Sequence, residues 1–491
     1  MTITSKILPV CLLLALCLSA LPAAASQARN KTEIVAEIDD YVRENMEANR
    51  ISGAALAITY GEEVFYSRGY GEDAEGRKIT DTTSFPIASL SKSMTALAVL
   101  QLVDEGLIEL DAPYGSYFPG ILPENHHFNQ ITVRNLLNQT SGLTDKVNPD
   151  MTRSVQFQSL QEIKKSLNLV KLANDPGETY SYHNPNYQYL ALLVEQVSEQ
   201  RFSEYLQHHI FVPLGMKDTF SVSTTEQINE HPAVVQGHYL LLGKPTHTDE
   251  PLWFIEGAAG VISTARDMEK WMRAQFDPRL LSPQLMEQYH AAGQHSPYGM
   301  GWLASNDDGW GSTISHSGIF WTYKSEERVF LEKQLGITMM FDTGINAFVD
   351  YSSFVRGISQ IMNGEKADIP ALNSRNMEMA MSLLMVGTIF WGGYSYFRMK
   401  KTDNWKSSFR RKLIFSSIWS LSPVLVLLFL SPIFSLIGGG RVLPWIGIWL
   451  TMPSLIIWLV LLSLVNLLSI ICRCCIYYKV KKESKSGVVP Q

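Results

Sequence analysis

The sequence predicts an α+β domain, in which an antiparallel sheet is flanked by helices and joined to a mostly helical subdomain, followed by C-terminal transmembrane helices. Two observations lead to this prediction. Strand and helix patterns open and close the region 26–363, and a mostly helical stretch lies between them. Beyond residue 376, three apolar stretches are each long enough to cross a bilayer. A chain of 491 residues has room for one large domain and such an anchor.

Residues 1–25 have the layout of a secretory signal peptide. Lys6 precedes an apolar run over residues 7–21, and three alanines lead to an expected cleavage site before Ser26. The domain that follows is therefore expected to be exported. It contains none of the five cysteines of the chain, so we expect its hydrophobic core, and not disulfides, to stabilise it.

The exported region contains apolar patterns typical of both helices and strands. Asn30 and Glu33 form a capping pattern before the first helix, and Gly61 separates the two strands of a hairpin. The expected elements are, in order, a helix over 30–48, strands over 53–60 and 63–70, a buried helix over 89–105, short helices and loops over 107–175, helices over 187–199 and within 257–272, strands over 323–331 and 335–342, and a helix over 347–362.

A linker over 364–376 leads to the predicted membrane spans, which are followed by a basic tail over 472–491. The spans are 377–397, 413–437 and 442–471. Seven Lys and Arg residues lie between the first two spans and one between the second and third, so the positive-inside rule places the basic loop and the tail in the cytoplasm. Glu378, at an outer edge, is the one charged residue within these spans, so we expect an anchor and not a transporter.

Charge is distributed unevenly along the chain. The formal net charge is -6, but residues 376–491 carry 13 Lys and Arg against 3 Asp and Glu, which leaves a net charge of -17 for residues 26–375. This acidic balance argues against nucleic acid or an anionic lipid surface as partner of the exported region. No motif indicates a cofactor or a metal site, and we expect neither.

Ser89 and Lys92 stand three residues apart at the start of the predicted buried helix, so their side chains share one helix face. Burial of a lysine is costly unless the amine loses its proton or finds acceptors. Activation of the neighbouring serine would explain the lysine, because a serine hydroxyl is a weak nucleophile until a base takes its proton. The structural alternative is an N-cap serine beside a lysine that reaches the surface, and the Ser-x-x-Lys pattern alone does not decide between them.

Two further motifs follow SLSK at 89–92. They are YHN at 182–184 and HSG at 316–318. With these motifs the sequence resembles the serine β-lactamase and penicillin-binding protein superfamily, in particular its class C-like branch of membrane-anchored DD-peptidases and esterases. The resemblance covers roughly residues 31–362. It also includes IASLSKSMTALAVLQLVDEGLIELDAP, LLNQTSGL, PGETYSYHNPNYQYLALLVE, FVPLGM and GVISTARDMEKWM.

The resemblance implies catalytic roles for three residues. Ser89 would be the acylated nucleophile, Lys92 would lower the proton affinity around it, and Tyr182 would act across the cleft as base or proton relay. Tyrosine and lysine both have reference pKa values of about 10, so each needs a shifted pKa to act near neutral pH. A nearby cation lowers the pKa of a tyrosine, and burial lowers the pKa of a lysine.

The resemblance also implies binding roles. Asn184 would bind substrate and steady the lysine, and His316 would bind a substrate carboxylate or hold its strand. Gly318 would let the substrate backbone approach an edge strand closely. The backbone N–H groups of Ser89 and Ile319 would form the oxyanion hole.

Two places depart from the family's pattern. His183 stands in the middle of the second motif, where relatives usually have a small residue. Phe320, Trp321 and Thr322 follow the third motif, where relatives often place a further glycine, and these bulky residues would narrow the entrance. We also find no acidic residue to activate a deacylating water, so rapid β-lactam turnover is not expected.

The expected function is an extracytoplasmic serine hydrolase that forms an acyl-enzyme with D-amino-acyl peptides or esters, such as peptidoglycan-type peptides or small molecules. The resemblance implies a multi-pass protein of the bacterial cytoplasmic (inner) membrane, with its catalytic domain outside. Two alternatives stay open. One is a sensor that captures wall fragments or β-lactams without turnover and signals through its spans, and the other is a true β-lactamase.

Overall fold

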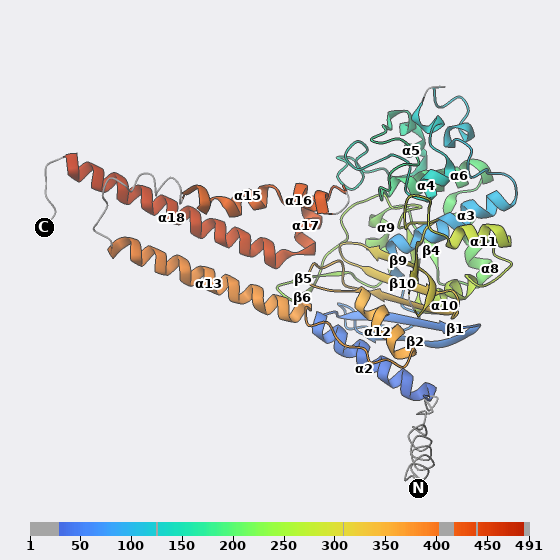
Figure 1. The fold of residues 1–491 in the computed structure, drawn as a ribbon, viewed down its shortest axis with the longest axis horizontal. Coiled ribbons are helices and arrows are strands. Elements are labelled where there is room, and N and C mark those ends of the chain that lie inside the picture. The colour runs from blue at the N-terminus through green and yellow to red at the C-terminus, as the bar shows by residue number, and fades with distance from the viewer. Residues whose placement is uncertain (1–28, 124–125, 308, 402–416, 438–439, 486–491) are drawn as a thin grey trace, which may run out of the picture.

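The computed structural model describes residues 29–123, 126–307, 309–401, 417–437 and 440–485, and the predicted signal peptide lies outside them. Figure 1 shows a domain from which a bundle of long helices extends to one side. We call this bundle, from α13 to α18, the helical arm.

A six-stranded antiparallel sheet runs through the domain in the order β2-β1-β11-β10-β9-β8. Its strands are β1 (Gly53–Tyr60), β2 (Glu63–Gly71), β8 (Leu303–Asp307), β9 (Gly311–Ile319), β10 (Lys324–Phe330) and β11 (Leu335–Phe341). β1, the first strand in the chain, pairs with β11, the last strand in the chain, and Ala57 lies opposite Thr338. Helices and antiparallel strands therefore open and close the domain, which confirms the predicted α+β class.

Helices cover both faces of this sheet. On one face, α2 (Lys31–Asn49) and α12 (Ser352–Met362) form a core with β1 and β11. On the other face lie α10 (Ala265–Ala274) and, beyond it, α3 (Ser91–Asp104) (Figure 1). Because both faces are covered, β1 is buried from Gly53 to Thr59 and shows no alternation of apolar and polar residues.

The helical subdomain packs around α3, and its elements are short. Its helices are α4 (Val133–Leu137), α5 (Leu160–Ser166), α6 (Pro185–Ser198), α7 (Phe202–Leu206), α8 (Val212–Leu214), α9 (Thr225–Glu230) and α11 (Pro283–His290). The remaining strands form two small sheets, β3 (Phe85–Pro86) with β7 (Val261–Ser263) and β4 (Phe220–Ser221), and β5 (His238–Leu241) with β6 (Lys244–His247).

The differences from the sequence prediction include the strand that contains the third motif and the start of the last helix of the domain. The third motif was expected just before a strand, but it lies inside β9, whose many Ser and Thr residues give no apolar alternation. Backbone pairing with β8 and β10 forms this strand instead. The last helix of the domain begins at Ser352, after the expected position 347, because the preceding residues form a turn in which Val349 N–H donates to the Asn346 carbonyl at 3.2 Å.

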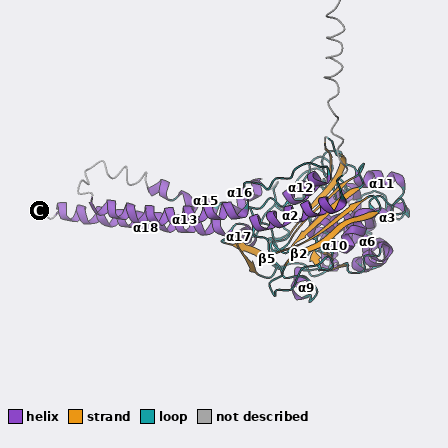
Figure 2. Ribbon diagram, turned by 90° about the horizontal axis from the view of Figure 1, so that it is seen from below, coloured by secondary structure: helices purple, strands orange, loops and turns teal. Residues whose placement is uncertain are grey.

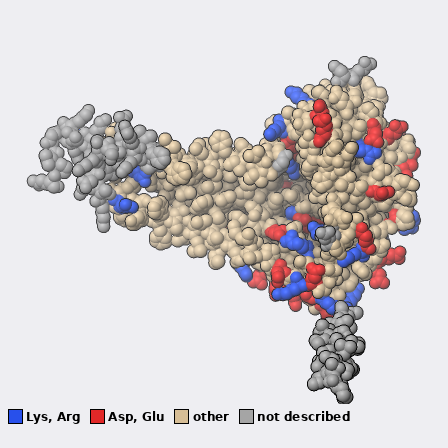
Figure 3. All heavy atoms as spheres, viewed as in Figure 1, with Lys and Arg blue, Asp and Glu red and all other residues tan. Residues whose placement is uncertain are grey.

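The helical arm consists of α13 (Ser374–Lys401), α15 (Ser422–Leu428), α16 (Leu430–Ile437), α17 (Trp445–Thr451) and α18 (Pro453–Lys485). Figures 1 and 2 show α13 and α18 side by side, both leading away from the domain, while α15 and α16 lead back to it. On the face in Figure 3, the charged residues gather on the domain, and the middle of the arm is free of them.

In the part of the chain that the structure describes, one helix is long and apolar enough to cross a membrane, Pro453–Lys479 within α18. The segments Ser417–Leu428 and Leu430–Ile437 qualify only as a pair, bent by 61°. Membrane association is therefore supported by one helix, and the three spans stay a prediction.

The structure divides the stretch 442–471, which we expected to be one span. Pro453 disfavours helical geometry at the preceding residue, and Met452 accordingly leaves the helical region with φ -149° and ψ 56°. α17 thus ends before α18 begins, and it lies against the domain, where Ala347 N–H donates to the carbonyl of Thr451 at 3.1 Å.

Candidate active site

Ser89 lies in the 3₁₀ turn Ala88–Leu90 that leads into α3. Ala88 has φ 49°, a left-handed conformation that residues other than glycine rarely adopt. Ser91 holds this turn, because its Oγ donates to the Ala88 carbonyl at 2.6 Å and accepts from Val261 N–H at 3.0 Å. The strained turn places Ser89 at the floor of a cavity, where 8% of its surface is exposed.

Lys92 is fully buried beside Ser89. Its Nζ lies 3.0 Å from Ser89 Oγ, 3.0 Å from Asn184 Oδ1 and 2.7 Å from the Ala258 carbonyl. It also lies 4.9 Å from the ring centroid of Tyr182. Burial, with a smaller contribution from the charge of Arg441, lowers the pKa of Lys92 well below its usual range. The predicted pair is thus assembled, and the alternative of a lysine that reaches the surface is excluded.

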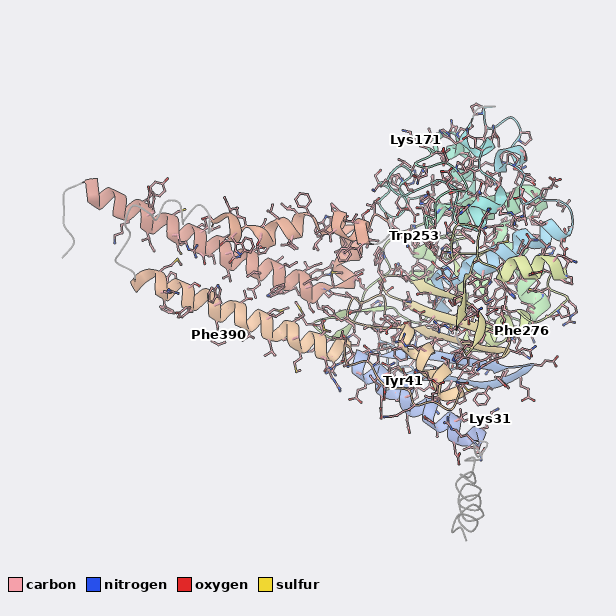
Figure 4. All side chains as sticks on the ribbon, viewed as in Figure 1. Lys31, Tyr41, Lys171, Trp253, Phe276 and Phe390 are labelled. Carbon is pink, nitrogen blue, oxygen red and sulfur yellow. The ribbon has the colours of Figure 1, made fainter. Side chains whose placement is uncertain are left out.

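Tyr182 and Asn184 lie directly before α6 and face the nucleophile from the subdomain. Tyr182 lines the same cavity as Ser89, and burial raises the pKa of this tyrosine. Asn184 Nδ2 donates to Asp150 Oδ2 at 2.9 Å, and Asp150 Oδ1 accepts from Trp253 Nε1 at 3.0 Å. Asp150 therefore orients the amide so that its oxygen faces the lysine. Figure 4 shows Trp253 on the side of the domain that faces the arm.

His316 is present as a neutral ring whose nitrogens are both used inside the protein. Its Nδ1 lies 2.9 Å from the Ser317 carbonyl, which can only accept, so Nδ1 carries the proton and Nε2 accepts from the Tyr298 hydroxyl at 3.0 Å. Burial lowers the pKa of His316 to about 3. Of the two predicted roles, this geometry favours holding the strand over binding a substrate carboxylate, because the ring offers no charge.

Gly318 has a different role from the predicted one. A Cβ built on it would lie 2.3 Å from the Ile87 carbonyl and 2.0 Å from Ser325 Oγ. The glycine therefore lets β9 approach the turn that holds Ser89, and a side chain at this position would meet Ile87, Ala88 and Ser325. The next residue, Ile319, lines the cavity together with Ser89, as the predicted oxyanion pair requires.

A cavity of about 460 Å³ lies in front of these residues. From the domain it is lined by Ser89, Met151, Tyr180, Tyr182, Asn184, Glu250, Trp253, Tyr298, Leu303, His316, Ser317, Ile319, Phe320, Trp321, Ile345 and Ala347, and from the arm by Phe434, Arg441, Leu443, Ile448, Thr451 and Met452. Within the described part of the chain, no three His, Cys, Asp or Glu side chains gather closely enough to hold a metal ion.

A family model described as beta-lactamase matches residues 38–351, well over half of the chain. The chain belongs to the β-lactamase family. This confirms the resemblance that the three ordered motifs indicated, and members of the family include penicillin-binding proteins and AmpC-type proteins.

Individual relatives agree with this assignment. The chain is 28% identical over 317 residues to protein flp of Staphylococcus aureus strain MW2, a match that covers 62% of each chain. It is 25% identical to penicillin-binding protein 4* of Bacillus subtilis, covering 66% of this chain and 75% of that one. The match thus spans less than two thirds of flp.

Solved structures show the same fold. The octameric penicillin-binding protein homologue from Pyrococcus abyssi superposes with a TM-score of 0.58 at 22% identity, covering 68% of this chain and 78% of the other. The D-alanine carboxypeptidase AmpC from Burkholderia cenocepacia gives 0.55 at 21% identity, covering 68% and 100%. The serine β-lactamase and penicillin-binding protein fold is therefore established for the domain.

His183, the first departure from the family pattern, connects the second motif to the arm. It is fully buried, and its Nδ1 lies 2.7 Å from Asp145 Oδ1. Asp145 Oδ2 accepts a hydrogen bond from the backbone N–H of Val442, in the segment between α16 and α17, at 3.1 Å. His183 and Arg441 both help to lower the pKa of Asp145. The unusual histidine thus helps to seat the arm.

Trp321, one of the bulky residues that follow the third motif, also contacts the arm. A Cβ built on Gly447 of α17 would lie 2.5 Å from the Trp321 ring, so the helix backbone packs directly on the indole. Glu250 holds the backbone there, since its carboxyl accepts from the N–H groups of Trp321 at 3.1 Å and Thr322 at 2.9 Å. Burial raises the pKa of Glu250 to about 7.

Sequence reasoning missed several residues of this site, among them Asp145, Asp150 and Arg441. The two aspartates stand in a loop region with no motif, so no sequence signal marked them. Arg441 had a signal, because it is the one charge between the last two apolar stretches. We used that charge only for membrane topology.

Proposed function

We propose that the protein is a membrane-anchored serine hydrolase that acts outside the cytoplasm, through an acyl-serine intermediate, on D-amino-acyl peptides or esters. The observation that carries the proposal is the position of Lys92 Nζ, which lies 3.0 Å from both Ser89 Oγ and Asn184 Oδ1 and is shielded from water. A buried amine in contact with a serine hydroxyl is suited to take its proton.

The shifted pKa values support a division of roles between the two proton carriers. Lys92 has a lowered pKa and so favours the neutral amine. In that form its two protons are donated to Asn184 Oδ1 and the Ala258 carbonyl, and its lone pair accepts from the Ser89 hydroxyl. Tyr182 has a raised pKa and favours the neutral phenol, which suits a relay and not a resting base.

The proposed reaction has two steps. Ser89 Oγ attacks the substrate carbonyl, its proton passes to Lys92, and the backbone N–H groups of Ser89 and Ile319 stabilise the oxyanion. The bond to the leaving group then breaks, and the leaving amine or alkoxide receives that proton through Tyr182. Water attacks the acyl-serine in the second step, which releases the carboxylic acid and returns a proton to Ser89.

The domain boundaries and the location in the cell belong to the same proposal. Residues 26–363 would form the exported domain, and the spans near 377–397, 413–437 and 453–471 would anchor it in the cytoplasmic membrane. The arrangement of the arm supports this, because α13 and α18 lead away from the domain and α15 and α16 return (Figure 1). The basic loop and tail would then lie together on the cytoplasmic side.

One observation favours a second candidate, a penicillin- or wall-fragment-binding sensor with slow turnover. Glu250 is the one acidic residue among the described residues that line the cavity. Its oxygens accept hydrogen bonds from Trp321 N–H and from Thr322 N–H and Oγ1. It is therefore not free to activate a deacylating water, and a stable acyl-enzyme would result.

The test uses the full-length protein in detergent micelles. We expect a fluorescent penicillin to add its mass to the chain at Ser89, and an N-acyl-D-alanyl-D-lactate ester to be hydrolysed. Ser89→Ala should abolish both, while Ser116→Ala, which removes an exposed hydroxyl, should leave both unchanged. Label without hydrolysis would favour the sensor. Hydrolysis that survives in Ser89→Ala would overturn the proposal.

A further inference from the structure

The catalytic cavity is closed on one side by the helical arm. Phe434 of α16, Arg441 and Leu443 of the following segment, and Ile448 of α17 line the same cavity as Ser89. The contacts that seat this segment are specific, since Val442 N–H donates to Asp145 and Gly447 packs on the Trp321 ring. The arm is therefore part of the site as well as a tether.

Arg441 is the one Lys or Arg among the described residues that line the cavity. Its Cζ lies 5.3 Å from the ring centroid of Tyr182. Its Nε is buried and has no hydrogen-bond partner in the described part of the chain. Arginine keeps its proton in proteins, so this position holds a permanent positive charge, and its Nε–H is an unused donor. Such a group is suited to bind a carboxylate.

His316 supplies no such charge. Its ring is neutral, and both nitrogens are bonded to Tyr298 and Ser317. A negatively charged substrate group in this cavity therefore finds its partner on the arm, and not on the third motif.

The rest of the lining is mostly apolar and is continuous with the arm. Leu443 and Ile448 belong to a hydrophobic cluster of the arm that also includes residues of α16 and α18, among them Leu430 and Leu459. α18 contains the helix that is apolar enough to cross a membrane. The arm therefore gives the cavity an apolar wall next to the helix that is apolar enough to cross a membrane, and an apolar substrate chain would be stabilised by contact with this wall.

We propose that the substrate is an anionic amphiphile: an acyl ester or amide with a carboxylate near the reacting carbonyl and a long apolar chain, in which Arg441 binds the carboxylate and the arm receives the chain. This inference rests on the proposed function and specifies its substrate. The chemistry is unchanged, because Ser89 forms the acyl bond, the alcohol or amine leaves with the serine proton, and water completes hydrolysis.

The experiment measures kcat/KM of the full-length protein in phospholipid nanodiscs with four substrates. These are N-acetyl- and N-dodecanoyl-D-alanyl-D-lactate, each as the free acid and as the methyl ester of the lactate carboxyl. We expect the wild-type protein to prefer the dodecanoyl free acid by at least about 10-fold over both its acetyl and its methyl ester counterparts, because a charge-assisted hydrogen bond and a buried chain each contribute this much.

Arg441→Gln should lower kcat/KM for the free acids about 10- to 100-fold and for the methyl esters less than about threefold. Arg441→Lys should recover part of the preference. Arg375→Gln, the same change at an exposed position of α13, is the matched control. It should leave kcat/KM unchanged for both the free acids and the methyl esters. Thermal unfolding of each variant shows whether it is folded.

Three results would overturn the inference. The wild-type protein could show no preference for chain length, or no preference for the free acid. The Arg441→Gln variant could lose kcat/KM equally for the free acids and the methyl esters. Labelling of Ser89 by a fluorophosphonate separates this outcome from failure of the proposed function. If labelling and turnover depend on Ser89 but these preferences are missing, only the inference about the substrate is wrong. If labelling and turnover are both absent, the proposed function is wrong as well.

Discussion

On the domain side of the cavity, polar groups satisfy one another, whereas the arm brings apolar side chains and one cation with an unused donor. Lys92 Nζ has three hydrogen-bond partners within 3.0 Å, and both nitrogens of His316 are bonded. Arg441 Nε has no partner among the described residues. In the proposed function, the domain would supply a preorganised reaction centre, and the arm would supply the surface on which substrates are distinguished.

The largest expected effect tests the domain side. Lys92→Ala should lower the acylation rate about 10⁴-fold or more, nearly as far as Ser89→Ala, because nucleophile and base act as a unit. Lys92→Arg is the matched control and should be equally inactive, since a guanidinium does not give up its proton to become a base. Time-resolved fluorophosphonate labelling measures the rate. Near-normal acylation in either variant would show that the amine is not the base.

A smaller effect concerns the boundary between the two sides, at Glu250. Burial raises its pKa from 4.5 to about 7, so the folded state binds its proton more tightly than the unfolded state. The resulting stability is fully present below pH 4.5 and is lost as pH rises to 7, by at most about 3 kcal/mol. Glu250→Gln should therefore reduce the change of the free energy of unfolding with pH over this range.

Denaturant unfolding at a series of pH values measures this effect. The control is Glu62→Gln, which changes an exposed side chain and should keep the wild-type slope. An unchanged slope in Glu250→Gln would mean that this carboxyl does not hold its proton in the folded protein.

The smallest expected effect tests the arm side alone. Gly447→Leu places a side chain where the Trp321 ring lies, so α17 must move away from the domain. We expect kcat/KM for long-chain substrates to fall about 10-fold and labelling by small fluorophosphonates to change less than about threefold. Gly393→Leu, where an added Cβ meets no atom within 4 Å, should change neither. Equal loss of both activities would mean that the two sides are not separable.

Much of the fold followed from local sequence patterns. The hairpin of β1 and β2, the capping of α2 by Asn30 and Glu33, and the pairing of Ser89 with Lys92 depend on residues close together in the chain. Such patterns can be interpreted without knowing the fold. β9 was missed because its polar residues conceal the strand that backbone pairing forms.

The rest of the site depends on contacts between distant segments. Asp145 meets Val442 across 297 positions of the chain, and no pattern in either segment indicates the other. The two departures from the family pattern, His183 and Trp321, were visible in the sequence, but the bulky residues after the third motif were expected only to narrow the entrance. Only the fold shows that both support the arm.

The position of Arg441 in the chain has a consequence for work on this protein. A soluble fragment that ends before α13 would keep Ser89, Lys92, Tyr182 and His316, but its pocket would be open on one side and lack the guanidinium. Inhibitors selected against that fragment would be fitted to a surface that the whole protein covers. During biosynthesis, too, Ser89 is made before the segments 434–452 that complete the lining of its pocket.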